Sequence, residues 1–499
     1  MQREKVCGVV GLARAGVPAA RFLAERGARV LGFDAKPRTE LSADALALEA
    51  LGVELRVGDS SFAGLKECTQ IILSPGLKIH HEPLRSVLVQ CEARGADIIG
   101  ELELAARHCP APMIAVTGTK GKSTTTKLIE EMLAAAGVSV VRAGNSGIPL
   151  IAELSNLSPD SWAVVEVSSF QLEKAPTLKP RIAVLLNLLA DHQDYHTSLD
   201  QYWQTKLKLF ANQGEGDTAI WNLDDAHLAA MKSTNQLPQT GAKQVLTTSG
   251  EWNETTNPCV CARKGFLGFS NAGGFEKFIA LDEIPLRGAH NASNVAAALA
   301  AVETALAQNN DDFDAHCEAI REAVRNFASL PHRLEKVGVV DGVQYINDSQ
   351  ATIPEAAMRA LEAYPAPVTL ICGGLDKLGD PHGYDALGET AARSAHLLVT
   401  IGQAAPLIEA AARRAGMPDE KIISAENLTN AVESATIRTP AGGTVVLSPA
   451  CASFDQFKSY EERGEIFRSL VAQLETRQSA SLVPARENDP ASPQQGVAR

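Results

Sequence analysis

This 499-residue sequence is short of three things: long apolar runs, excess positive charge and closely paired cysteines. Its longest apolar run, residues 182–190, is interrupted by Asn187 and is far too short to cross a bilayer. The first ten residues lack the apolar segment of a signal peptide, so we expect a cytoplasmic protein. The 46 Lys and Arg residues are outnumbered by 59 Asp and Glu residues, and the net charge of −13 argues against a nucleic-acid partner.

The nine cysteines are scattered, and only Cys259 and Cys261 lie close together in the sequence. A C-x-C pair without a second pair is a poor zinc motif. Buried free thiols in a reducing compartment account better for this pattern. Apolar residues make up 45% of the chain, which is enough for a large core, and the length predicts about three domains.

Strand and helix patterns alternate along most of the chain, which predicts an α/β protein with parallel sheets covered by helices. We expect a Rossmann-like N-terminal domain over 1–108, a central P-loop ATPase-like parallel sheet over 109–330 and a Rossmann-like C-terminal domain over 331–478. Residues 479–499 contain many breakers and no apolar period, which predicts a disordered tail. Residues 236–285 are rich in Gly, Asn and Thr, and we expect short strands and turns on the surface there.

The apolar patterns also predict individual elements. The predicted strands after the first are 28–33, 113–116, 162–167, 181–187, 344–347, 368–372, 397–401 and 444–447. The main predicted helices of the central segment are 124–136, 199–210 and 291–307.

The first strand, Val6–Val10, is followed by G-L-A-R-A-G at 11–16, a helix, and a second strand that leads into Asp34. This order resembles the opening of a Rossmann unit. The second glycine of the dinucleotide fingerprint is replaced by Ala13, whose methyl group hinders the approach of a pyrophosphate. The pattern therefore weakens the case for NAD and favours another nucleotide.

A shortened phosphate loop, T-G-T-K-G-K-S at 117–123, lies between a predicted strand and a predicted helix. Gly118 and Gly121 let the backbone turn so that its N–H groups face an anion. Lys122 can reach the β- and γ-phosphates, and the Ser123 hydroxyl group can bind Mg²⁺. This arrangement predicts that the chain binds ATP.

Acidic and histidine residues follow two further predicted strands. Glu166 ends one of them, where P-loop proteins usually place a second Mg²⁺ contact. After the next come Asp191, His192, Asp194 and His196, a cluster that could hold zinc or, with a phosphate loop nearby, more plausibly magnesium. On the residue pattern alone, the lysines of the helix that follows would lie on a solvated face.

Eight motifs occur in order along the chain, and together they resemble the Mur ligase superfamily, the ATP-dependent amide-forming enzymes of peptidoglycan precursor synthesis. The motifs are G-T-K-G-K-S, E-V-S-S-F-Q-L-E, N-L-L-A-D-H, K-L-K-L-F, H-N-A-S-N, L-P-H-R-L-E, Y-I-N-D-S-Q-A-T and L-S-P-A-C-A-S-F-D-Q-F. The second and the last are most similar to the branch that adds D-glutamate to UDP-N-acetylmuramoyl-L-alanine. The resemblance covers nearly the whole chain except the tail.

The resemblance implies a reaction in which ATP phosphorylates the substrate's carboxylate and the amine of D-glutamate attacks the acyl phosphate. It implies ATP contacts by Gly118, Thr119, Lys120, Gly121, Lys122, Ser123, Thr124, Asn294, Arg333 and Asp348. Two Mg²⁺ ions would be held by Ser123, Glu166, His192 and Lys206. Lys206, rather than Lys208, would carry a carbamate made from CO₂. Lys122, Glu166, His192 and Lys206 would then form the catalytic group.

The resemblance also implies where the other substrates bind. The UDP-substrate would contact Asp34, Ser74, Gly76, Asn145, Ser168, Gln171 and His192. D-Glutamate would contact Thr352, Lys377, Ser453 and Tyr460. The sequence departs from the family pattern at Gln350, where many relatives have Lys, at Tyr460, where Phe also occurs, and at residues 35–36, where Ala-Lys replaces Thr-Arg. We expect a monomer.

Other functional hypotheses remain open. Within the superfamily, other members add L-alanine, a diamino acid or D-Ala-D-Ala, or extend folate with glutamate. The D-N-P-R signature of the diamino-acid enzymes is missing here, and a folate enzyme would not need a uridine domain around Asp34. An NAD-linked oxidoreductase conflicts with Ala13, and a non-catalytic regulator would be expected to lack Lys122, Glu166 or His192.

Overall fold

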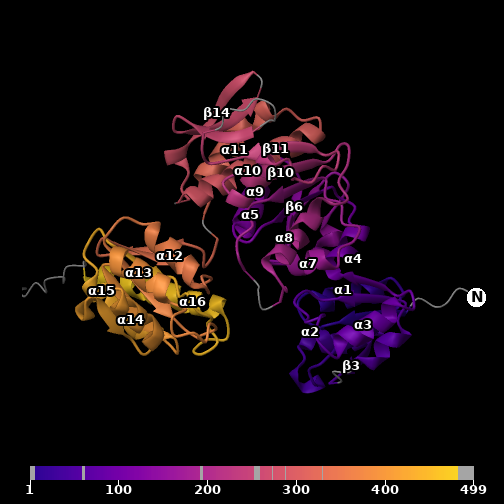
Figure 1. Cartoon of the computed structure of the whole chain (residues 1–499), viewed down its shortest axis with the longest axis horizontal. Helices are drawn as coiled ribbons and strands as arrows, with labels where there is room; N and C mark the ends of the chain where they lie inside the picture. Colours follow the sequence, from indigo (N-terminus) through magenta and orange to yellow (C-terminus); the bar gives the residue numbers. More distant parts are fainter. Residues whose placement is uncertain are drawn as a thin grey trace, which may run out of the picture. The chain divides into compact units, whose positions relative to one another are not determined.

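Three β-sheets organise the chain in a computed structural model that describes residues 6–58, 62–191, 195–251, 259–271, 273–286, 288–328 and 330–481 (Figure 1). The chain divides into two compact units, 1–327 and 328–499. The first unit contains two of the sheets and the second unit contains the third. Most strand pairs are parallel, so the predicted α/β class is confirmed.

The first sheet has five parallel strands in the order β3-β2-β1-β4-β5. The strands are β1 (Val6–Val10), β2 (Arg29–Asp34), β3 (Glu54–Val57), β4 (Gln70–Leu73) and β5 (Asp97–Gly100). The helices are α1 (Gly16–Glu25), α2 (Ala43–Leu46), α3 (Leu84–Glu92) and α4 (Glu101–His108). Because β1 lies at the centre, its loop and the loop after β4 open at the same edge, where ligands of doubly wound sheets bind.

The central sheet has nine strands in the order β14-β13-β12-β11-β10-β9-β6-β8-β7. The strands are β6 (Met113–Thr117), β7 (Val140–Gly144), β8 (Trp162–Glu166), β9 (Ile182–Leu185), β10 (Thr218–Asn222), β11 (Lys243–Thr247), β12 (Cys259–Arg263), β13 (Phe266–Asn271) and β14 (Gly274–Ala280). The helices are α5 (Lys122–Ala135), α6 (Leu150–Glu153), α7 (Ser169–Glu173), α8 (Leu199–Leu207), α9 (Ala226–Ser233), α10 (Ala289–Gln308) and α11 (Phe313–Arg325).

Both faces of the central sheet are buried, which explains the continuous apolar runs of its strands. Ile114 and Val116 of β6 pack with α5 and α10 in one core, whereas Ala115 packs in a second core that also contains residues of the first sheet. The sheet therefore shares one core with its neighbour inside the first unit.

The short strands predicted within 236–285 are present, but they extend the central sheet and are partly buried rather than lying wholly on the surface. Strand β11 pairs in parallel with β10, and β12, β13 and β14 extend the same sheet as an antiparallel meander. Leu267 is fully buried in the core that contains helix α10, and Cys261 is fully buried in the core on the opposite face of the sheet. The polar composition reflects the turns between the strands rather than a separate surface structure.

The third sheet has the order β15-β16-β20-β17-β18-β19, with only the edge strand β15 antiparallel to its neighbour. The strands are β15 (Glu335–Val340), β16 (Val343–Asn347), β17 (Val368–Gly373), β18 (Leu397–Ile401), β19 (Ile422–Ser424) and β20 (Thr444–Leu447). The helices are α12 (Pro354–Glu362), α13 (Asp385–Ser394), α14 (Ala405–Arg414), α15 (Leu428–Arg438) and α16 (Tyr460–Ser481). Helix α16 runs into the range predicted as a tail from residue 479, and residues 482–499 lie outside the described residues.

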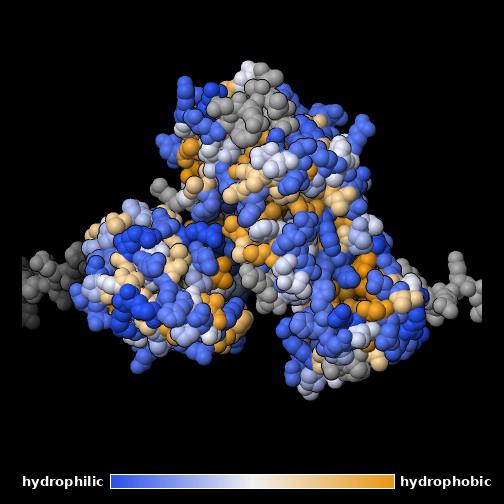
Figure 2. Space-filling view, in the orientation of Figure 1, coloured by the Kyte–Doolittle hydropathy of each residue, from blue (hydrophilic) through white to orange (hydrophobic). Residues whose placement is uncertain are grey.

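Within the described residues, no helix is long and apolar enough to span a membrane. Hydrophilic residues cover most of the face seen in Figure 2. All nine cysteines are free thiols, and all but Cys109 and Cys317 are buried, as the sequence predicts.

Candidate active site

The phosphate loop joins β6 to α5 and has the strand–loop–helix form that the sequence predicts. Gly121 has a φ of 89°, in the left-handed region, and a Cβ atom there would lie 2.4 Å from Asn294 Oδ1. A side chain at this position would therefore be strained and would collide with α10. Helix α5 begins directly after Gly121, at Lys122 rather than at the predicted residue 124. Thr124 follows on its first turn, partly exposed.

Asn187 holds this loop, a role that the sequence reasoning missed. Its Oδ1 atom accepts hydrogen bonds from Thr119 N and Lys120 N, both at 2.9 Å, and its Nδ2 atom donates to Lys120 O at 3.0 Å. Strand β9 ends at Leu185, two residues before the predicted end, so Asn187 lies beyond the ladder beside the loop. In the sequence, the feature that could have indicated this role is a polar residue at the end of a predicted buried strand.

The lysines of the loop have local partners. Lys122 Nζ donates to Gly118 O at 3.0 Å and to Thr119 O at 2.9 Å. Lys120 Nζ lies 3.3 Å from Asp191 Oδ2. The Lys122 ammonium group is thus held against the phosphate loop, where its charge could offset the charge of a bound phosphate group.

Ser123 and Glu166 lie together at the ends of neighbouring elements. Ser123 Oγ donates to Glu166 Oε2 at 2.6 Å, and Asn145 Nδ2 donates to Glu166 Oε1 at 3.0 Å. Glu166 is almost fully buried. A hydroxyl oxygen and a carboxylate beside a phosphate loop fit the oxygen preference of Mg²⁺.

Lys206 is buried, contrary to the solvated face that its sequence pattern alone suggests. Its Nζ atom donates to Gly118 O at 3.0 Å and lies 4.4 Å from the centre of the Tyr202 ring. Burial, reinforced by the positive charge of Lys122, holds the pKa of Lys206 well below its ordinary value. Lys208 is exposed and lies outside this environment.

The predicted D-H-x-D-x-H cluster is only partly described, because His192 and Asp194 lie outside the described residues. His196 is buried, and its Nε2 atom lies 3.1 Å from Ser169 Oγ. The described residues contain no group of three or more His, Cys, Asp or Glu side chains that could hold a metal ion.

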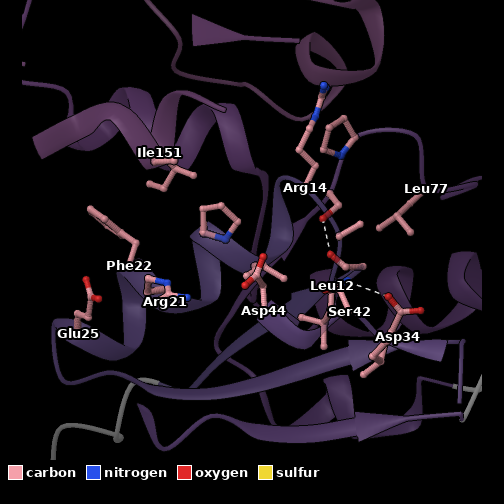
Figure 3. A pocket seen from close by; sticks show the side chains of 18 of the residues that line it. Leu12, Arg14, Arg21, Phe22, Glu25, Asp34, Ser42, Asp44, Leu77 and Ile151 are labelled. Atoms are coloured by element: carbon pink, nitrogen blue, oxygen red, sulfur yellow. Dashed lines mark hydrogen bonds between the residues drawn. The ribbon is translucent and has the colours of Figure 1, made fainter. Parts of the chain in front are cut away.

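A cavity of about 1280 Å³ opens at the edge of the first sheet (Figure 3). Asp34, Ser74 and Gly76 all line it. Asp34 accepts hydrogen bonds from Leu12 N at 2.8 Å and Lys36 N at 3.0 Å, which orders the loop after β1. Figure 3 places Asp34 at one end of the cavity and Phe22, on α1, at the other.

Ser168 and Gln171 form the capping box of α7, directly after β8. Ser168 N and Ser168 Oγ both donate to Gln171 Oε1 at 3.0 Å, and Gln171 N donates to Ser168 Oγ at 3.4 Å. Asn145 lies at the end of the adjacent strand, and its backbone N–H group bonds to Glu166 O. The three residues therefore lie at the same edge of the sheet as the phosphate loop.

In the second unit, Asp348 is buried directly after β16. It accepts hydrogen bonds from Ser448 Oγ at 2.8 Å and from Leu334 N at 3.1 Å. Burial raises the pKa of Asp348 to about 7, against the opposing effects of these bonds and of the charge of Arg333. Arg333 itself is partly exposed.

The four residues predicted to contact D-glutamate lie beyond three adjacent strands and at the start of one helix. Thr352 follows β16, Lys377 follows β17, Ser453 follows β20, and Tyr460 begins α16. Lys377 is exposed, whereas Ser453 is 2% exposed. Because parallel strands deliver their loops to one edge, the three loops are neighbours.

Family models match three consecutive parts of the chain. Residues 5–100 match a Mur ligase MurD-like N-terminal domain, residues 116–302 a Mur ligase middle domain and residues 332–451 a Mur ligase glutamate ligase domain. The chain belongs to the Mur ligase family.

Several relatives of this Mur ligase carry the name UDP-N-acetylmuramoylalanine–D-glutamate ligase. The protein from Pelotomaculum thermopropionicum is 39% identical over 472 residues, 95% of this chain and 98% of the relative. The protein from Acidobacterium capsulatum is 38% identical over 467 residues, 93% of this chain and 95% of the relative.

Solved structures support the fold of this Mur ligase. A UDP-N-acetylmuramate-alanine ligase from Thermotoga maritima has a TM-score of 0.55 at 17% identity, covering 95% of this chain and 99% of that one. The MurF ligase of the same organism, in complex with ADP, has a TM-score of 0.53 at 16% identity, covering 82% and 96%.

The Mur ligase has another central residue that sequence reasoning missed, Arg463 on α16. It is fully buried and binds the loops after β16 and β20 at once. Its guanidinium group donates to Ser349 Oγ at 3.0 Å, Ser349 O at 2.8 Å and Cys451 O at 3.3 Å, and also to Ala452 O at 3.4 Å. Ser349 lies 114 residues before Arg463 in the sequence, so no local sequence pattern reveals this contact.

Proposed function

We propose that this Mur ligase adds D-glutamate to UDP-N-acetylmuramoyl-L-alanine with ATP as the energy source. The observation that carries the proposal is the identity of 38–39% with ligases of that name, which extends over almost the whole chain. The matching glutamate ligase domain at 332–451 supports the same amino acid. For such an enzyme we expect a monomer in a bacterial cytoplasm, with domains 1–108, 109–330 and 331–478.

The phosphate loop, residues 118–124, would bind the ATP phosphates, and Lys122 would meet their charge. Asn294 touches this loop, which supports its proposed ATP contact. From the second unit, Arg333 and Asp348 are proposed as further ATP contacts.

Mg²⁺ would be held by Ser123 and Glu166, whose oxygens already lie 2.6 Å apart. A second ion would use His192 and Lys206. Bound Mg²⁺ supplies positive charge that offsets charge on the transferring phosphoryl group.

A carbamate on Lys206 fits the chemistry of its site. CO₂ reacts with a neutral amine, whose nitrogen bonds to the carbon and then loses a proton. Burial lowers the pKa of the Lys206 amine, which raises the fraction of the neutral form that CO₂ requires. Carbamylation would turn the side chain into an oxygen ligand.

The UDP-substrate would occupy the cavity lined by Asp34, Ser74 and Gly76. Asn145, Ser168 and Gln171 would hold its muramoyl-alanine portion beside the phosphate loop. D-Glutamate would contact Thr352, Ser453 and Tyr460, and the Lys377 ammonium group would pair with its side-chain carboxylate.

In the proposed reaction, the alanyl carboxylate oxygen attacks the γ-phosphorus of ATP, and ADP leaves. The D-glutamate nitrogen then attacks the carbonyl carbon, loses a proton and expels phosphate as the amide forms. The carboxylate alone is a poor electrophile, so the anhydride must form where water is excluded.

The test is phosphate release from ATP and UDP-N-acetylmuramoyl-L-alanine, with D-glutamate, L-glutamate, L-alanine or a diamino acid offered in parallel. We expect release only with D-glutamate, and a product heavier by one glutamyl residue. Release with a different amino acid would overturn the assignment while keeping the family chemistry. Lys122→Ala should abolish release, which excludes a contaminating ATPase.

Within the same assay, Lys377→Ala should raise the KM for D-glutamate far more than the KM for ATP. A lost charge-assisted contact predicts an effect of roughly tenfold or more on the former. Equal effects on both constants would remove Lys377 from the amino-acid pocket.

A further inference from the structure

Tyr384 is a buried side chain whose hydroxyl group lies between two loops of the second unit. It is 1% exposed and directly precedes α13. Its hydroxyl group donates to Asp376 Oδ1 at 2.9 Å and lies 3.3 Å from Cys451 Sγ. Asp376 belongs to the loop after β17 and Cys451 to the loop after β20.

These two loops carry Lys377 and Ser453, the residues proposed to contact D-glutamate. Lys377 directly follows Asp376, and Ser453 lies two residues after Cys451. The loops also pair through their backbones, since Leu375 N donates to Ala452 O at 2.9 Å. The Tyr384 hydroxyl group therefore adds a side-chain connection between the two loops to this backbone contact.

The protonation states fix the direction of both hydrogen bonds. Burial opposes ionisation of Asp376, but hydrogen bonds from Leu378 N, Tyr384 OH and Gly379 N hold its pKa below the ordinary value. Burial raises the pKa of Cys451 to about 11. The Tyr384 O–H group thus donates to an ionised carboxylate, and its oxygen can accept the Cys451 S–H group.

The loop after β20 is also strained, and so depends on such contacts. Ala450 has a φ of 61°, a left-handed conformation that costs a residue with a side chain free energy. The conformation persists only where the surroundings determine it. Tyr384 holds this loop on the β17 side, and Arg463 holds it on the β16 side.

We propose that Tyr384 is a positioning residue for D-glutamate: its hydroxyl group sets the spacing between the Lys377 loop and the Ser453 loop. The inference rests on the proposed function, because that function assigns both loops to the amino-acid pocket. Tyr384 itself does not touch the substrate.

The test is Tyr384→Phe, which keeps the ring and removes only the hydroxyl group. We expect the KM for D-glutamate to rise roughly threefold to tenfold, the size of one lost hydrogen bond, with the KM for ATP unchanged. Tyr345→Phe is the matched control. Tyr345 is equally buried in the same unit, and its hydroxyl group bonds only Thr436 Oγ1 among the interactions described, at 2.8 Å.

Both variants should lose similar stability, so a selective rise in the D-glutamate KM for Tyr384→Phe alone would support positioning. Equal KM values in the two variants would overturn it. Should Tyr384→Phe fold poorly, Cys451→Ala removes the other partner and should raise the same KM by a smaller factor; no rise in either variant overturns the inference. Wild-type protein that is inactive with D-glutamate would instead refute the proposed function.

Discussion

Two basic side chains are almost fully buried, Lys206 on α8 and Arg463 on α16, and their surroundings differ. Neither has a carboxylate hydrogen-bond partner among the contacts described. Within the described part of the chain, Lys206 makes one hydrogen bond, to Gly118 O, and burial lowers its pKa strongly. Arg463 bonds four acceptors, and burial lowers its pKa only to about 10, so it stays charged.

The difference shows how each side chain can be used. A buried lysine with few partners gives up its proton more readily than an exposed one, and its neutral amine is a nucleophile. An arginine with a full set of carbonyl acceptors keeps its charge and serves as a structural tie. Burial alone therefore does not distinguish a reactive site from a scaffold; the number of hydrogen-bond partners does.

The largest expected effect comes from removing the Lys206 side chain. Lys206→Ala should lower kcat by about a thousandfold, because an electrostatic contribution at the phosphoryl group is lost. Added short carboxylates should restore part of the activity. Steady-state phosphate release measures both effects, with the exposed Lys208→Ala as control. Absence of rescue would remove the support for a carbamate at Lys206.

Removing the hydrogen bonds of Arg463 should lower stability rather than activity. Arg463→Lys cannot reproduce the planar set of bonds, and we expect the free energy of unfolding to fall by about 3 kcal/mol. Urea unfolding measures this change, with the exposed Arg477→Lys on the same helix as control. A change no greater than that of the control would contradict the structural role of Arg463.

A buried anion extends the comparison. Glu101 is 2% exposed and accepts a hydrogen bond from Ile151 N at 3.2 Å, and burial raises its pKa to about 7 from an ordinary value of 4.5. The folded protein therefore binds more protons than the unfolded chain between these pH values. Its free energy of unfolding should fall as pH rises across this window, by about 3 kcal/mol more than in Glu101→Gln.

Urea unfolding of both proteins at pH 4.5, 6 and 7.5 measures this difference. The glutamine keeps an acceptor for Ile151 N but does not titrate. Parallel pH profiles for the two proteins would show that folding does not raise the pKa of Glu101.

Local pattern was sufficient for much of the architecture. The strands Leu397–Ile401 and Thr444–Leu447 have the predicted ends, because buried parallel strands form continuous apolar runs bounded by breakers. The phosphate loop was equally predictable, because its glycines, the preceding strand and the following helix are contiguous in the sequence. The site assignments at its edge stay predictions.

What the sequence did not reveal depends on distant partners. Asn187 bonds a loop 67 residues away, and Arg463 bonds Ser349, 114 residues away. Burial of Lys206 likewise depends on the loop at Gly118, 88 residues earlier. Short strands were predicted within 236–285, but their place in the central sheet was not, because turn composition does not show which sheet a strand joins.

The two carbonyl bonds of Lys122 have a consequence for turnover. A phosphate group that takes over either of the N–H donors bonded to Gly118 O and Thr119 O gains only the difference between the two partners. When ADP departs, the carbonyls can take the lysine back. If the loop binds ATP as proposed, nucleotide exchange would involve a replacement of partners at Lys122, which would reduce the free energy that product release requires.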